Sequence, residues 1–160
     1  MLTTKEQKGV AVDNTNLEIL KILQQKARIP NVEVSRMINL APSAVLERIR
    51  KMESQGIIDG YEVRLNPERF NRSLVSFMQV YPNHGSNNET IAEALADFEE
   101  VQEVHYIAGD DCFLIKARTA NMPELARVRS RIGSIEGVQA TKTFPVLATR
   151  KETAQIPLHA

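Results

Sequence analysis

From residue 13 to residue 52 the apolar positions recur at helical spacing. Val45, Ile49 and Met52 follow one another at i, i+4 and i+7, so they lie on one side of an α-helix. Polar and charged residues occupy most of the remaining positions. This pattern predicts a helix over residues 42–54 that turns one side toward a core.

The ends of this helix are marked as well. Pro42 fits the first helical position, where its missing N–H has no intrahelical partner. Ala41 is then the N-cap, a poor choice that costs about 0.5–2 kcal/mol relative to Ser or Thr. Gly56 ends the helix.

Two helices are predicted upstream. Asp13 is a suitable N-cap for a helix that runs to about Ala27, and Asn31 for a short second helix after Pro30. Three short helices with a tight turn before the third are typical of a helix-turn-helix, whose third helix enters the major groove of DNA. The apolar positions are Leu17, Leu20 and Leu23 or their neighbours Ile19 and Ile22 in the first helix, and Val34, Met37 and Ile38 in the second.

After Gly56 the pattern changes. IIDGYEV, residues 57–63, predicts a short β segment, and LNPERFNR a hinge. The chain then runs strand, helix, strand, strand, helix, strand, which is the order of a ferredoxin-like fold. We expect strands over 74–82 and 138–148, and two more within 101–119 that are joined at Gly109-Asp110. We expect helices over 87–100 and 121–132, the second of them capped by Asn121.

The sequence therefore predicts an α+β protein. Its parts are an N-terminal tail (1–12), a three-helix helix-turn-helix domain (13–60), a hinge (61–73), a C-terminal ferredoxin-like βαββαβ domain (74–151) and a C-terminal tail (152–160). A sheet of this kind leaves one face uncovered by its own helices, and we expect a homo-oligomer for that reason.

The composition is that of a globular protein with an aliphatic core: 42% of the 160 residues are hydrophobic and 5% aromatic. Lys+Arg and Asp+Glu number 20 each, so net charge alone does not indicate a nucleic-acid partner. A single cysteine excludes an intrachain disulfide and favours the cytoplasm. No signal-peptide pattern and no run of about 18 apolar residues is present, so we expect no membrane partner.

The polar side of the third helix carries the candidate chemistry. In a helix-turn-helix, Ser43 and Glu47 would lie nearest the bases, with Arg50 farther along. Arginine suits the O6/N7 edge of guanine, and glutamate accepts from N4 of cytosine. Arg48 and Lys51 fit phosphate contacts, which position a protein without reading sequence.

Ser35 and Arg36 of the second helix are further candidates for the DNA backbone. A second interpretation of the same charges stays open. A mixed-charge helix face is often just solvated, and Glu47 has the i,i+3 and i,i+4 spacing to form ordinary surface pairs with Arg50 and Lys51.

Three segments carry a family resemblance: VDNTNLEILKILQQKARI, LAPSAVLERIRKMESQGIIDGYEVRLNPERF and IAGDDCFLIKA. In this order, from about Asp13 to about Lys151, the chain resembles the Lrp/AsnC family of transcription regulators. The resemblance implies a helix-turn-helix joined to a ferredoxin-like domain that dimerises, often assembles to octamers, and binds a small-molecule effector, usually an amino acid. It assigns recognition to Ser43, Glu47, Arg48 and Arg50.

The resemblance places the effector region at the hairpin of Gly109, Asp110, Asp111 and Cys112. Two departures from the family pattern stand out. Ala41 replaces a frequent Ser, and the hairpin lacks the last carboxylate of the usual Gly, acidic, aromatic, Asp series. Turn amides could hold an effector's carboxylate, and Asp110 or Asp111 its ammonium group. Gly-Asp is also ordinary hairpin-turn chemistry, and Cys112 fits a packed strand position.

Other functions leave weaker signals. Sirohaem decarboxylases resemble the same two-part architecture, and in such an enzyme His105 would bind substrate or move protons. An amino-acid-sensing regulatory subunit without DNA binding is a third class. His84, His105 and His159 are scattered, with no spacing typical of zinc, and no phosphate loop or dinucleotide motif is present. We therefore expect no metal and no cofactor.

Overall fold

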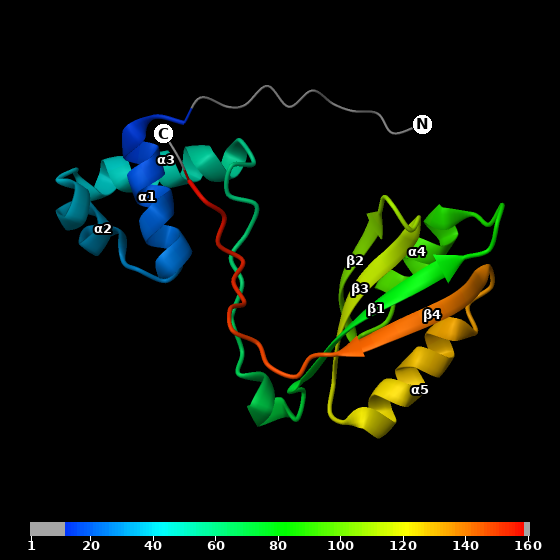
Figure 1. The fold of residues 1–160 in the computed structure, drawn as a ribbon. Helices are drawn as coiled ribbons and strands as arrows, with labels where there is room; N and C mark the ends of the chain where they lie inside the picture. Colours follow the sequence, from blue (N-terminus) through cyan, green and yellow to red (C-terminus); the bar gives the residue numbers. More distant parts are fainter. Residues whose placement is uncertain (1–11, 159–160) are drawn as a thin grey trace. The chain divides into compact units, whose positions relative to one another are not determined.

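The computed structural model describes residues 12–158, which form two compact units (Figure 1). The first contains residues 12–63 together with 152–158, and the second contains residues 64–151. Of the expected N-terminal tail, only Val12 lies within the described residues.

The first unit is built from α1 (Asn14–Gln25), α2 (Asn31–Ile38) and α3 (Pro42–Ser54). Its core consists of Ile19, Leu23, Val34, Val45, Ile49 and Met52. As predicted, Asp13 caps α1, since its carboxylate accepts the N–H of Asn16 at 2.7 Å. Ala41 precedes α3 without a side-chain cap, and Pro42 is its first residue.

Two helix ends differ from the prediction. α1 ends at Gln25 rather than near Ala27, because the chain turns before Pro30 and the Ile29 N–H bonds to the Lys26 carbonyl. Asn31 is the first residue of α2 and not its N-cap. The cap is Pro30, whose carbonyl accepts the N–H groups of Glu33 and Val34.

The β segment predicted for residues 57–63 is wrong. No strand forms there, because no neighbouring strand supplies ladder partners. The N–H groups of Ile57 and Ile58 instead bond back to the carbonyl of Met52, and both side chains pack against the helical core. The expected hinge contains a short 3₁₀ helix, η1 (Pro67–Phe70).

The second unit follows the predicted ferredoxin-like order: β1 (Leu74–Pro82), α4 (Asn88–Ala96), β2 (Val101–Ile107), β3 (Cys112–Thr119), α5 (Met122–Gly133) and β4 (Val138–Pro145). In the described chain the strands form one antiparallel sheet in the order β2-β3-β1-β4. α4 ends at Ala96, earlier than residue 100, because the chain turns over residues 97–100 into β2.

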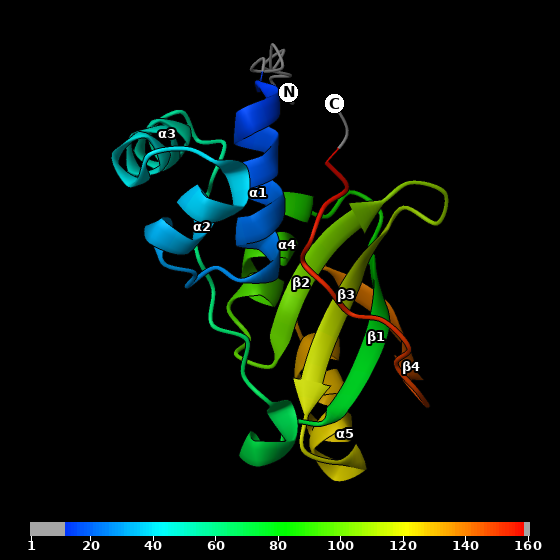
Figure 2. The same ribbon diagram turned by 90° about the vertical axis from the view of Figure 1, so that its left-hand side faces the viewer.

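The two faces of the sheet differ. Met78, Val80, Phe113 and Ile115 pack with Ile91, Leu95, Leu125, Val128 and Ile132 of α4 and α5, which lie on the same face (Figure 2). The alternate residues of β1 face the other way. Among them Phe77 is 37% exposed, and its register partner Phe144 on β4 is 43% exposed. The second unit thus leaves one sheet face uncovered, as expected.

We expect Gly137→Ala to destabilise the second unit. Gly137 has a φ of 89°, and an added Cβ would lie 3.0 Å from Oγ of Ser86 and 3.2 Å from Cδ1 of Ile91. Backbone strain and overpacking together should lower the free energy of unfolding by about 1–3 kcal/mol, measured by urea denaturation.

The matched control is Gly60→Ala. No atom lies within 4 Å of the Cβ that this change adds. It should alter stability by less than about 1 kcal/mol. Equal denaturation midpoints for the two variants would contradict the role assigned to Gly137.

Candidate functional site

The exposed side of α3 is set by its buried side. Val45 and Met52 are fully buried and Ile49 is 7% exposed, so the helix cannot turn about its axis without opening the core. Ser43, Glu47, Arg50 and Lys51 are consequently exposed. These are four of the residues predicted to face DNA.

The surface-pair alternative is not observed for this face. Within residues 12–158, Glu47 forms no ion pair with Arg50 or Lys51, and neither basic side chain has another hydrogen-bond or ion-pair partner. As far as the described part of the chain shows, the exposed side of α3 thus carries two cations, Arg50 and Lys51, and one carboxylate, Glu47, without bonded partners.

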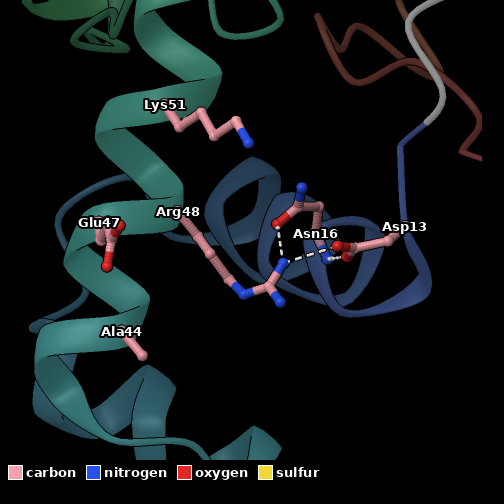
Figure 3. Close-up of a pocket in the computed structure, with 6 residues that line it drawn as sticks. All are labelled: Asp13, Asn16, Ala44, Glu47, Arg48 and Lys51. Atoms are coloured by element: carbon pink, nitrogen blue, oxygen red, sulfur yellow. Dashed lines mark hydrogen bonds and ion pairs between the residues drawn. The ribbon is translucent and has the colours of Figure 1, made fainter.

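Arg48 is placed differently from the other candidates. Its Nη1 lies 2.7 Å from Oδ2 of Asp13 and 2.9 Å from Oδ1 of Asn16, so it reaches across to α1 (Figure 3). The hydrogen bond from Arg48, followed by that from the backbone N–H of Asn16, lowers the pKa of the Asp13 carboxyl. Asp13, Asn16, Ala44, Glu47, Arg48 and Lys51 line an open cleft of about 390 Å³.

The two candidates on α2 also differ from each other. Arg36 is exposed. Ser35 is only 5% exposed, and its hydroxyl donates to the carbonyl of Val32 at 2.8 Å. Ser35 is thus withdrawn from the surface that was expected to touch phosphates, because its hydroxyl satisfies a backbone acceptor inside α2.

One surface residue of α3 was missed from the sequence. Leu46 is 36% exposed and lies one turn from both Ser43 and Arg50. An apolar side chain on such a face suits the methyl group of thymine. The sequence contained a signal for this position, because Leu46 follows Ser43 by three residues and precedes Arg50 by four, which places it on the same side of the helix.

The C-terminal part of α3 is tied to the segment that follows it. The hydroxyl of Tyr61 donates to Oε1 of Glu53 at 2.9 Å. Burial, then the hydrogen bond to Glu53 and its negative charge, raises the pKa of Tyr61 to about 12. This bond connects the end of α3 to the extended chain after it.

Three of the predicted effector residues, Gly109, Asp110 and Asp111, lie in the turn between β2 and β3, and Cys112 is the first residue of β3. Gly109 has a φ of 98° and Asp111 a φ of 47°, which the tight turn requires. The amide of Gln79 donates to Asp110 at 3.4 Å, and the hydroxyl of Tyr81 donates to Gln79 at 3.1 Å. Burial and then the charge of Asp110 raise the pKa of Tyr81.

Gln79 and Tyr81 were not predicted, because only the pairing of β1 with β3 brings them to the hairpin. Cys112 is buried, and burial, followed by the charges of Asp110 and Asp111, raises the pKa of its thiol. A protonated buried thiol fits packing better than ligand chemistry.

His105, the residue of the enzyme alternative, is exposed and pairs with Glu103 at 3.3 Å. Glu103 also bonds Lys116 at 3.1 Å.

Among residues 12–158 no cluster of His, Cys, Asp or Glu side chains is able to hold a metal ion. No helix in this part of the chain is long and apolar enough to cross a membrane.

Comparison with known proteins identifies both units. Residues 12–59 match the model of a winged helix-turn-helix DNA-binding domain, and residues 75–156 match that of the Lrp/AsnC ligand binding domain. The chain is 38% identical to the HTH-type transcriptional regulator FL11 of Pyrococcus horikoshii, over 93% of this chain and 98% of that protein.

Two further similarities cover nearly the whole chain. The leucine-responsive regulatory protein of Escherichia coli is 34% identical over 98% of this chain and 97% of its own. The crystal structure of a transcriptional regulator from Neisseria meningitidis in complex with L-methionine superposes with a TM-score of 0.86 at 30% identity. That match covers 91% of this chain and 96% of the other.

The bond between Tyr61 and Glu53 predicts a late phenol ionisation. An unfolded tyrosine ionises near pH 10, and folded Tyr61 near 12, so between these values the folded state retains a proton that the unfolded state has lost. The contribution of Tyr61 to the free energy of unfolding is therefore fully present below about pH 10 and is lost as the pH rises toward about 12. Phenolate absorbance against pH measures the ionisation.

The Tyr61→Phe variant should lack the ionisation near pH 12, whereas the control Tyr106→Phe should retain it. If the phase near pH 12 is lost in Tyr106→Phe and kept in Tyr61→Phe, it belongs to Tyr106, and the prediction for Tyr61 is wrong.

Proposed function

The chain belongs to the Lrp/AsnC family of transcription regulators, and from this premise we propose that it binds specific DNA sequences under the control of an amino-acid effector. In this proposal the helix-turn-helix domain (13–60) reads DNA. The ferredoxin-like domain (74–151) binds the effector and assembles subunits, with residues 61–73 as the hinge between them.

The outer side of α3 carries the proposal. Arg50 and Lys51 are exposed and unpaired within the described residues, on a helix whose rotation the core fixes. An arginine in this setting is free to meet a guanine edge, while a lysine suits a phosphate. Ser43 and Glu47, on the N-terminal half of the helix, lie where recognition helices contact bases.

A homodimer would present two such helices to a pseudo-palindromic site. The uncovered sheet face of the second unit supports this assembly. It holds the partly exposed Phe77 and Phe144 as register partners, next to Gln79 and Lys142. A second copy of the same face would bury the aromatic side chains and leave the polar ones at the rim. Assembly of dimers to an octamer stays a prediction.

For the effector we propose an amino acid at the β2–β3 hairpin, which includes Gly109, Asp110, Asp111 and Cys112. Asp110 is the better candidate for the ammonium group, because it already accepts a hydrogen bond from Gln79 beside Tyr81. Asp111 holds the left-handed position of the turn instead. The methionine complex of the Neisseria regulator supports an effector of this chemical class.

The DNA-binding proposal predicts different effects for two neighbouring cations. Arg50→Ala should lower affinity and also relax the preference at one base position, by about 1–3 kcal/mol, because a base contact is lost. Lys51→Ala should weaken binding to all sequences and reduce the log–log salt slope by about 0.9, because a phosphate contact is lost. Gel-shift titrations at several salt concentrations, against random competitor, measure both effects.

DNA from upstream of the protein's own gene is the first probe for these titrations. If neither substitution alters binding to a DNA that the wild type prefers, this side of α3 is not the recognition surface. If the wild type binds amino acids but prefers no DNA, the alternative of a sensing subunit without DNA binding is favoured.

The effector proposal predicts a difference between two adjacent carboxylates. Asp110→Asn should weaken binding of L-methionine or L-leucine by about tenfold or more, because a charged hydrogen bond contributes about 1.5–3 kcal/mol. Isothermal titration calorimetry on the full chain measures the affinity.

Asp111→Asn is the matched control, since asparagine tolerates the φ of 47° at that position. It should change affinity by less than about threefold, the effect of a modest electrostatic change at an exposed position. A larger loss for Asp111→Asn than for Asp110→Asn would exchange the roles of the two residues.

A further inference from the structure

A single carboxylate joins the start of α1 to the middle of α3. Oδ1 of Asp13 accepts the N–H of Asn16 and caps α1, while Oδ2 of the same group accepts Nη1 of Arg48. Asn16 adds its own side-chain oxygen to Nη1 at 2.9 Å. Figure 3 shows the three side chains converging at the α1 end of the cleft, with Glu47 and Lys51 on other parts of α3.

This arrangement leaves Arg48 poorly suited to a phosphate. Its Nη1 already donates to two oxygens, and the Arg48 side chain is 35% exposed. A phosphate placed beside it would also approach the negatively charged Asp13 carboxylate, whose Oδ2 lies 2.7 Å from Nη1. Lys51 has no such competitor, since its side chain forms no ion pair within residues 12–158.

The apolar core does not by itself fix the placement of α3. Burial of Val45, Ile49 and Met52 is non-directional, so it selects a side of the helix but tolerates small slides and tilts. A recognition helix needs its side chains held to about half an ångström. Hydrogen bonds from Arg48 to α1 supply a directional constraint near the centre of α3.

We propose that Arg48 is a positioning residue, which holds α3 against the N-terminus of α1 through Asp13 and Asn16 instead of contacting a DNA phosphate. The structural part of this proposal stands on its own. Its effect on DNA recognition rests on the function proposed above.

Asp13→Asn separates the two roles because they predict opposite results. Asparagine caps helices as well as aspartate does, so α1 keeps its cap while the ion pair is lost. If Arg48 contacted phosphate, losing its competitor would tighten binding. If Arg48 positions α3, the ratio of specific to random DNA affinity should fall by about twofold to fivefold, the range for a partly exposed ion pair.

Arg48→Lys adds a second readout. It retains the charge but not the guanidinium, whose Nη1 donates to both α1 residues, so the specificity ratio should fall with an unchanged salt slope. Lys51→Ala is the matched control, in which the slope should fall by about 0.9. Gel-shift titrations of the full chain measure all three variants, and circular dichroism checks that each is folded.

The specificity ratio and the salt slope together distinguish a positioning role of Arg48 from a phosphate contact. A lower specificity ratio with an unchanged slope, in both Asp13→Asn and Arg48→Lys, supports the positioning role. Tighter or unchanged binding by Asp13→Asn would overturn it. So would a salt slope that drops in a fourth variant, Arg48→Ala, as it does in Lys51→Ala.

A double-mutant cycle keeps the proposal testable if the wild type prefers no DNA. Unfolding midpoints of Asp13→Asn, Arg48→Met and the double variant should be non-additive, because either single change already breaks the link. Additive effects would show that the two residues are not coupled, whereas coupling without DNA binding would contradict only the proposed function.

Discussion

The burial of one side of α3 constrains everything that the helix can present to a partner. Val45, Ile49 and Met52 fill the core of the helical unit, so the remaining side chains have fixed directions around the helix axis. Arg50 is exposed, Lys51 lines the same cleft as Arg48 without bonding to it, and Arg48 reaches α1. Three basic residues within four positions thus differ in their bonding, although their chemistry is similar, because only Arg48 is held by α1.

Periodicity predicted most of this architecture. The ordering of the strands, the caps at Asp13 and Asn121, and the buried faces of the helices depend on local patterns that the structure retains. The strand prediction was wrong because strand formation depends on a second segment that is distant in the sequence. The alternation of IIDGYEV is typical of a strand, but a strand needs a ladder, and none is available to residues 57–63.

The candidate site was predictable only in part, for the same reason. The face of α3 follows from helical spacing alone. The partner of Arg48 is 35 residues away, and only the packing of α1 against α3 determines it. Gln79 and Tyr81 come near the hairpin because β1 pairs with β3, which fixes their distance from Asp110. Ser35 was expected at the surface, yet it is buried, because it lies one turn before Ile38, which packs against the core.

Charge and topology together suggest why sensing and assembly share a domain in the proposed function. With no net charge, the chain gains little from non-specific attraction to DNA, so useful affinity depends on several recognition helices acting together. The surface that would join the subunits is the uncovered sheet face. Gln79 and Tyr81 alternate with the core residues Met78 and Val80, so they lie on that same uncovered face as Phe77. An effector bound there through Asp110 would touch the assembling surface directly, and its binding energy would act on assembly without a long-range signal.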